Sequence, residues 1–238
     1  MNGLNGVMQT IIICPNCNHE FDVNDARFPV PVGMDDHAKD KHVPALSDSE
    51  PRGTSVADVA MFLFHVGFAQ AEAEYGDTSL HVAARSANVE IVKYLIVTDG
   101  AKVNVKNNAR FTPLHWAALR NNDVEVVKYL VSMGASVHAK DKDGSTPLHF
   151  ASRNNVNVEV AQFFVSVGAD VNAEDQYGLT PLLLAAGWNG NIAVVRFLVS
   201  EGADVNAIDG SGRTSLDHAK GNRAKIRYLK SVGAKSGK

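Results

Sequence analysis

Short apolar runs at helical spacing alternate with polar, glycine-containing loops through the last two thirds of the chain. In residues 124–131 (VEVVKYLV) the apolar side chains recur every three or four positions, and Lys128 lies on the opposite side. Residues 192–199 (IAVVRFLV) repeat this pattern. A shorter apolar segment with adjacent alanines precedes each run, after a Thr-Pro-Leu or Thr-Ser-Leu phrase. The pattern therefore predicts pairs of short helices joined by loops.

The phrase that opens each pair returns at a fixed interval of 34 residues. Its five copies are Thr78-Ser79-Leu80-His81, Thr112-Pro113-Leu114-His115, Thr146-Pro147-Leu148-His149, Thr180-Pro181-Leu182-Leu183 and Thr214-Ser215-Leu216-Asp217. Self-similarity at such a period indicates stacked two-helix units, because one unit alone cannot bury its apolar face.

The same residue types explain why each unit begins and ends where it does. The threonines can cap a helix, and proline suits the first turn, where its missing N–H costs nothing. The leucines of the five phrases are predicted to point into the stack, and the alanines allow close helix packing. A glycine follows each second helix, where a left-handed residue ends a helix; these are Gly100, Gly134, Gly168, Gly202 and Gly233.

The Thr-Pro-Leu-His-x-Ala phrases, five times in phase, make the chain resemble the ankyrin repeat family. The resemblance implies an all-α fold, an ankyrin-type helical solenoid with short β-hairpin-like loops between repeats. It divides residues 55–238 into a degenerate cap (55–74), repeats 75–107, 108–141, 142–175 and 176–209, and a carboxy-terminal cap repeat (210–238). The family's usual period is one residue shorter, so we expect an extra surface residue per unit, near Asn121 in the second.

The resemblance also assigns structural roles to residues that could suggest chemistry. His81, His115 and His149 occupy one repeat position, where the family uses histidine to steady the loop by hydrogen bonds. Trp116 stands where sister units have Val82 or Phe150, and we expect it in the core. Arg110 replaces a turn glycine, so we expect a distorted hairpin there. No catalytic motif remains, and the sequence predicts a non-enzymatic protein.

In this family the hairpin tips and first helices together form a concave face that grips partner proteins. Positions that vary between units on this face are the predicted partner-binding residues: Tyr75, Asp77, Arg85, Phe111, Leu119, Arg120, Lys142, Asp143, Arg153, Tyr177, Leu179, Trp188 and Arg213. Large aromatic residues often dominate interface energies. Two interpretations stay open for these aromatics, because each could also lie flat on its own repeat.

Charge and composition narrow the class of partner. A net charge of −3 provides no global basic field for nucleic acid, and Arg223, Lys225, Arg227 and Lys230 are interpreted as the polar outer face of the last repeat. The longest apolar stretch, residues 56–73, contains Asp58 and His65 and is too polar to span a bilayer. We therefore expect a soluble protein that binds another protein.

The amino-terminal 54 residues have a different character. Cys14 and Cys17, on a tight turn between short strands within residues 1–23, resemble half of a zinc ribbon, and His37 and His42 would complete four ligands. A reduced cysteine pair without metal is the alternative. Residues 24–54 have linker composition. A zinc-dependent nucleic-acid-binding or regulatory protein, with the repeats as scaffold, is therefore the rival function.

Two further expectations concern the surroundings of the protein. Only two cysteines, three residues apart, favour a reducing compartment such as the cytoplasm, with nuclear or secreted locations left open. Met61, Phe64 and Phe68 give the cap an apolar surface that no earlier repeat covers. We expect the amino-terminal segment, a partner or a second copy of the chain to cover it, the last as a homodimer.

Overall fold

The computed structural model describes residues 11–13, 20–22, 76–86 and 89–237. The chain divides into two compact units, Met1–Pro51 and Arg52–Lys238. In the first unit, strands β1 (Ile11–Ile13) and β2 (Glu20–Asp22) pair antiparallel, with Ile12 opposite Phe21. The short strands that the sequence predicts on either side of the cysteine pair are therefore present.

Several predicted features lie outside the described residues. They are Cys14, Cys17, His37, His42, Tyr75, the linker 24–54, and the cap 55–74 with Met61, Phe64 and Phe68.

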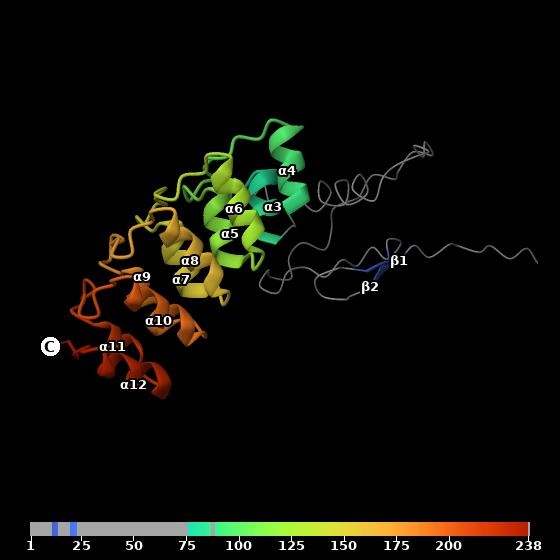
Figure 1. Cartoon of the computed structure of the whole chain (residues 1–238). Coiled ribbons are helices and arrows are strands. Elements are labelled where there is room, and N and C mark those ends of the chain that lie inside the picture. The colour runs from blue at the N-terminus through green and yellow to red at the C-terminus, as the bar shows by residue number, and fades with distance from the viewer. Residues whose placement is uncertain (1–10, 14–19, 23–75, 87–88, 238) are drawn as a thin grey trace, which may run out of the picture. The chain divides into compact units, whose positions relative to one another are not determined.

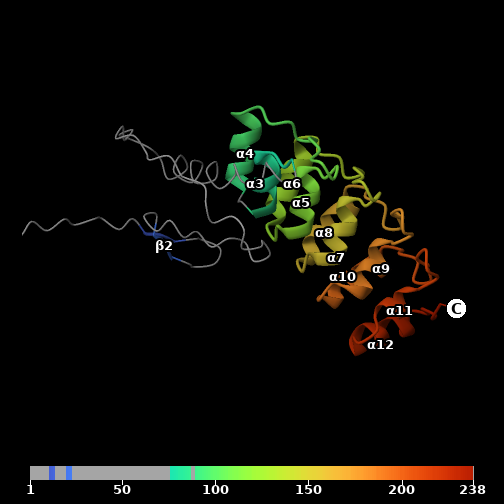
Figure 2. The same ribbon diagram turned by 180° about the vertical axis from the view of Figure 1, so that it is seen from behind.

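The second unit is a row of helix pairs (Figures 1 and 2). The first helices of the pairs are α3 (Ser79–Ser86), α5 (Pro113–Arg120), α7 (Pro147–Asn154), α9 (Pro181–Gly187) and α11 (Ser215–His218). The second helices are α4 (Val89–Val97), α6 (Val124–Ser132), α8 (Val158–Ser166), α10 (Ile192–Ser200) and α12 (Arg223–Ser231). Each helix contacts its own pair partner and the corresponding helix of the next pair, so the described residues form an all-α solenoid of stacked units.

Helix ends follow from the repeated residues. Thr112 caps α5 in a capping box, in which its side chain accepts the His115 N–H and the His115 ring accepts the Thr112 N–H. Thr146 and Thr214 cap α7 and α11 in the same way. At the other ends, Gly134 has a φ of 89°, a left-handed conformation that glycine adopts without strain.

The core is continuous along the row. The leucines of the Thr-x-Leu phrases are all buried, together with the alanines that follow them. Apolar residues of the second helices, such as Val126, Val127 and Leu130, complete each layer. Because each unit buries its apolar face against its neighbours, the stack has no separate central core.

A ladder of asparagines joins the units where the extra residue of each repeat was predicted. The Asn121 amide donates to the Ala84 carbonyl (3.0 Å), and Asn155 donates to the carbonyls of Ala118 (3.1 Å) and Asn121 (2.9 Å). Asn189 bonds in the same way to Ser152 and Asn155. The loop that links each helix pair thus supplies a hydrogen bond between units.

Lys225 ends this ladder. Its ammonium donates to the carbonyls of Ala185 (2.8 Å), Ala186 (2.9 Å) and Asn189 (2.5 Å), and the residue is only 2% exposed. The sequence interpretation of Lys225 as part of a polar outer face is therefore wrong. It holds for Arg223, Arg227 and Lys230, which are exposed. In earlier units an asparagine amide donates to the equivalent carbonyls. At the end of the ladder the Lys225 ammonium of α12 donates to them instead.

Candidate binding surface

Four hairpin tips among the described residues are each held by one Asp or Asn side chain. The Asp141 carboxylate accepts the N–H groups of Asp143 (2.9 Å) and Ser145 (2.8 Å) through Oδ1, while the Asp141 N–H donates to the Ser145 carbonyl. Asn107, Asp175 and Asp209 make the same bonds at the other tips. This arrangement fixes the backbone of every tip and so aims its remaining side chains.

Arg110 does not distort its hairpin. Its φ of 61° matches the φ of 66–81° at the corresponding glycines Gly76, Gly144, Gly178 and Gly212. Its N–H donates to the Asn107 carbonyl, as those of Gly144, Gly178 and Gly212 donate to the equivalent aspartate carbonyls. The predicted distortion is therefore wrong. The hydrogen bonds of Asn107 retain the turn and hold a non-glycine residue in the left-handed region, at a modest conformational cost.

The recurrent histidines attach the tips to the first helices. The Nε2 atom of His115 donates to the Ser145 carbonyl (3.3 Å) on the next unit's tip, and Nδ1 accepts the Thr112 N–H (3.1 Å). His81 and His149 make the equivalent bonds. Burial lowers the pKa of His115 to about 4 and also lowers the pKa values of His81 and His149. The predicted structural role of these histidines is confirmed.

A hollow of about 200 Å³ lies where the tips of three consecutive units meet α7 and α9. Its lining includes five of the predicted partner-binding residues, namely Phe111, Asp143, Arg153, Tyr177 and Leu179. The remaining lining residues are Asp141, Ser145, His149, Phe150, Asp175 and Leu184. The structure thus brings together side chains whose positions vary between repeats and that are far apart in the sequence.

Aromatic packing builds one wall of the hollow. The rings of Phe111 and Phe150 meet edge to face, with centroids 4.7 Å apart, and Phe111 also contacts His115 and Trp116 at 5.3 and 5.4 Å. Phe111 is therefore half-buried between rings of its own repeat and the Phe150 ring of the next, so it does not lie on its own repeat alone. Offset and edge-to-face contacts of this kind favour particular ring orientations.

Contrary to the sequence prediction, Trp116 does not belong to the core. It is half-buried, its indole N–H donates to Asp77 Oδ1 (3.1 Å), and the Arg85 guanidinium lies 5.3 Å from its ring. The corresponding residue varies in character from unit to unit (Val82, Trp116, Phe150, Leu184 and His218), whereas the phrase leucine never changes. That variation was the available signal that this position does not belong to the invariant core.

Two of the predicted partner-binding residues, Tyr177 and Trp188, are exposed aromatics, with 56% and 50% of their surface accessible. The Trp188 ring lies between the Arg153 guanidinium at 5.5 Å and the His218 ring at 5.4 Å. Tyr177 has its side chain at the rim of the hollow. Both rings can therefore lose much solvent contact when a partner binds.

The other predicted residues have varied environments. Arg120 and Lys142 are exposed, and Arg85 and Leu119 are half-buried. Asp77 is only 3% exposed because Asn107 and Trp116 donate to its carboxylate, so it stabilises a tip instead of presenting a free side chain.

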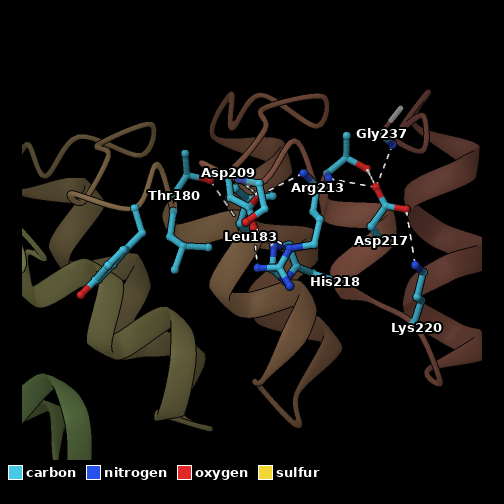
Figure 3. Close-up of polar contacts among 12 residues, drawn as sticks. Thr180, Leu183, Asp209, Arg213, Asp217, His218, Lys220 and Gly237 are labelled. Atoms are coloured by element: carbon cyan, nitrogen blue, oxygen red, sulfur yellow. Dashed lines mark hydrogen bonds and ion pairs between the residues drawn. The ribbon is translucent and has the colours of Figure 1, made fainter.

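Arg213 is exposed, but it forms an ion pair with the buried carboxylate of Asp209 at 2.8 Å (Figure 3). Burial opposes the charge of Asp209, yet bonds from Arg213, Ser211 and His218 hold its pKa well below the ordinary value. Arg213 therefore anchors the last tip of the described stack.

Two kinds of site are not found in the part of the chain that the structure describes. No group of three or more His, Cys, Asp or Glu side chains there could hold a metal ion. No helix among those residues has the length and apolar character needed to cross a membrane.

Comparison with known proteins agrees with this geometry. A family model described as ankyrin repeats (three copies) matches residues 80–175, 114–209 and 148–237, which together cover well over half of the chain. A search of curated proteins finds no match. The matched residues contain all ten helices of the solenoid except the first residue of α3. The chain belongs to the ankyrin repeat family.

Proposed function

We propose that this chain is a non-enzymatic interaction module that grips a partner protein on its concave face. Ankyrin repeats generally mediate protein–protein interaction. The observation that carries the proposal is the hollow, with the exposed ring of Tyr177 at its rim and that of Trp188 beside Arg153. A pocket flanked by exposed aromatic and arginine side chains has the composition of an interface centre.

The energetics favour these two rings as anchors. A buried aromatic side chain removes roughly 150–250 Å² of surface from water. The side chains that dominate interfaces cost about 2 kcal/mol or more of affinity when truncated to alanine. Because Tyr177 and Trp188 are half exposed in the free protein, their truncation should change the free energy of unfolding far less than the affinity.

The experiment is quantitative affinity capture from the native lysate, followed by titration of the recovered protein against purified variants. Trp188→Ala and Tyr177→Ala should each weaken binding about 30-fold or more and leave the thermal melt nearly unchanged. Tyr94→Ala is the matched control, because Tyr94 is an exposed aromatic on the second helix α4. If Trp188→Ala melts early and binds normally, Trp188 stabilises the fold and the proposed face is misplaced.

For the amino-terminal unit we propose a zinc ion held by Cys14, Cys17, His37 and His42. The support is the spacing of the cysteines between β1 and β2, since structural zinc requires four ligands. The metal content of the purified full chain tests it: about one zinc per chain is expected, and Cys14→Ser should remove it. A nucleic-acid-binding function, the rival, would require that zinc. Metal-free protein that still binds its partner would eliminate both.

Two smaller proposals complete the description. The apolar side chains of the cap, Met61, Phe64 and Phe68, support a second copy of the chain as one occupant of that surface, which light scattering tests. The cysteine pair supports a reducing, cytoplasmic environment.

A further inference from the structure

One carboxylate oxygen in the hollow has no donor. Asp141 is 6% exposed and lines the hollow, and its Oδ1 accepts two backbone N–H groups of its own tip. No hydrogen bond or ion pair reaches Oδ2 from the residues that the structure describes. The Oδ2 atom is also not completely enclosed by protein atoms. It is therefore accessible from the hollow.

At the other tips the equivalent atom has a partner within the chain. Asn107 Nδ2 donates to Asp77 (2.6 Å), and Asp175 Oδ2 accepts a bond from the Ser145 hydroxyl (3.4 Å). Asp209 Oδ2 accepts from Arg213 and from His218 Nε2, each at 2.9 Å (Figure 3). The comparison shows what the position requires: the second polar atom of each tip residue is normally satisfied.

The local sequence explains why Asp141 differs. The position that pairs with the next tip residue holds Asp77 for Asn107 and Ser145 for Asp175. It holds an apolar residue for the other two, Phe111 for Asp141 and Leu179 for Asp209. Phe150 stands where the last unit has the donor His218, and it too cannot donate. With no donor from the residues that the structure describes, Oδ2 is open to a donor from a bound molecule.

The charges around the hollow favour a cationic donor. Asp141, Asp143 and Asp175 line it with one cation, Arg153, whose guanidinium lies 5.5 Å from the Trp188 ring. Burial raises the pKa of Asp141, and the neighbouring charges of Asp143 and Asp175 raise it further. An added positive charge would relieve this repulsion. A metal ion is not the cation, because no acidic cluster among the described residues could hold one.

The walls and size of the hollow select the rest of the ligand. Phe111, Phe150, Tyr177, Leu179 and Leu184 present apolar surface. The volume of about 200 Å³ is below the roughly 300–1,000 Å³ typical of small-molecule pockets, so it suits a single side chain. Lysine and arginine combine an apolar stem with a charged end, and they bury the stem along apolar surface.

We propose that the hollow receives one lysine or arginine side chain of the partner protein, whose charged end donates to Asp141 Oδ2 while its stem lies on Phe111 and Phe150. This inference rests on the proposed function, because it names the side chain that the concave face recognises. The aromatic rim formed by Tyr177 then contacts the residues beside that cation.

The test uses the full chain with butylammonium and butylguanidinium as probes of the hollow, and 1-butanol as the uncharged control. In amide NMR spectra at low salt, both cations should shift the N–H signals of Asp143 and Ser145, which donate to Asp141. Butanol should shift them far less.

Asp141→Asn should weaken the affinity for both cations about tenfold. The variant should fold, because Asn107 makes the same tip bonds at the preceding unit. Asp170→Asn is the matched control, since it removes one exposed carboxylate outside the hollow and should leave cation binding unchanged.

The outcomes separate this inference from the proposed function. If the cations do not shift these signals, or if Asp141→Asn binds them equally well, the inference is overturned whatever the partner. A partner that still requires Trp188 would then leave the interaction function intact. If Trp188→Ala and Tyr177→Ala leave the partner affinity unchanged while the cations bind at Asp141, the proposed binding face is wrong. The hollow is then a cation site that does not take part in binding the partner.

Discussion

The buried histidines should make the solenoid lose stability in mild acid, and His115 allows the size of the loss to be worked out. His115 is fully buried, and its Nδ1 accepts the Thr112 N–H, so a proton on Nδ1 would remove that bond as well as bury a charge. Burial lowers its folded-state pKa to about 4, against about 6.5 in the unfolded chain.

The sign follows from which state binds more protons. Between pH 6.5 and pH 4 the unfolded chain is protonated at His115 while the folded chain is not, so acid favours unfolding. The full contribution of His115 is present above pH 6.5 and is lost as pH falls. The linkage relation gives a loss of about 2 kcal/mol between pH 7.5 and pH 5, and about 3 kcal/mol by pH 4. His81 and His149, whose pKa values are lowered by the same burial, add losses of the same sign.

The carboxylates act mostly at lower pH. Asp209 and Asp217 have lowered pKa values, so their contribution is lost only as pH falls through the acid range below about 4. Asp141 has a raised pKa and acts in the opposite direction, since its folded form gains a proton first. The interval from pH 7.5 to 5 therefore reports mainly on the histidines.

The assay is urea unfolding by circular dichroism at several pH values in that interval, with wild type and His115→Leu in identical buffers. Leucine is chosen because the fourth unit carries Leu183 at this position. At pH 7.5 the variant should be less stable by about 1–3 kcal/mol, because the N–H of Thr112 and the carbonyl of Ser145 each lose a partner. At pH 5 the difference should shrink by about 2 kcal/mol. His138→Asn, which removes an exposed histidine, is the control and should retain the wild-type pH dependence. An unchanged pH slope in His115→Leu would refute the reasoning.

Three further predictions test the repeat architecture. Ser152→Ala should stabilise the fold by about 1 kcal/mol and raise Tm by about 2–4 °C, because the Ser152 hydroxyl is fully buried without a hydrogen-bond partner and sister units have alanine there; a lower Tm would contradict it. His138→Asn should add about 1 kcal/mol at neutral pH by a loop-to-loop pair such as that of Asn172, which donates to the Gly202 carbonyl and accepts the Asp204 N–H; chemical denaturation measures it. A chain starting at Arg52 should keep its helical circular dichroism, because each unit packs on its neighbours; loss of helicity would show that the unit boundary is misplaced.

The features that recur in every unit could be predicted from the sequence because each depends on residues close together in the chain. A threonine cap, a leucine two positions after it and a glycine after the second helix act within one repeat. Their chemistry is local, and five copies in phase reinforce one another.

Two of the errors involve contacts between residues far apart in the chain. Asp77 was expected at the surface, but Asn107 and Trp116, 30 and 39 residues later, donate to its carboxylate. Lys225 was assigned to the outer face of the last helix because its neighbours in sequence are basic. Its ammonium instead reaches carbonyls that lie 36 to 40 residues earlier in the chain. No periodicity within a single unit contains that information.

Lys225 and Asp141 show two ways in which the repeat pattern can be interrupted. At the end of the asparagine ladder, the buried carbonyls need a donor that no further repeat supplies, and Lys225 of the same chain provides it. At the tip of Asp141, the Oδ2 atom also needs a donor. Phe111 and Phe150 occupy positions that supply a donor at other tips. Phe111 and Phe150 place apolar walls beside the unpaired oxygen of the Asp141 carboxylate, which is costly for the free protein. Asn107, Asp175 and Asp209 each have a partner for their second polar atom, whereas Asp141 Oδ2 is open toward the hollow. This contrast supports the proposal of a donor that arrives with the partner.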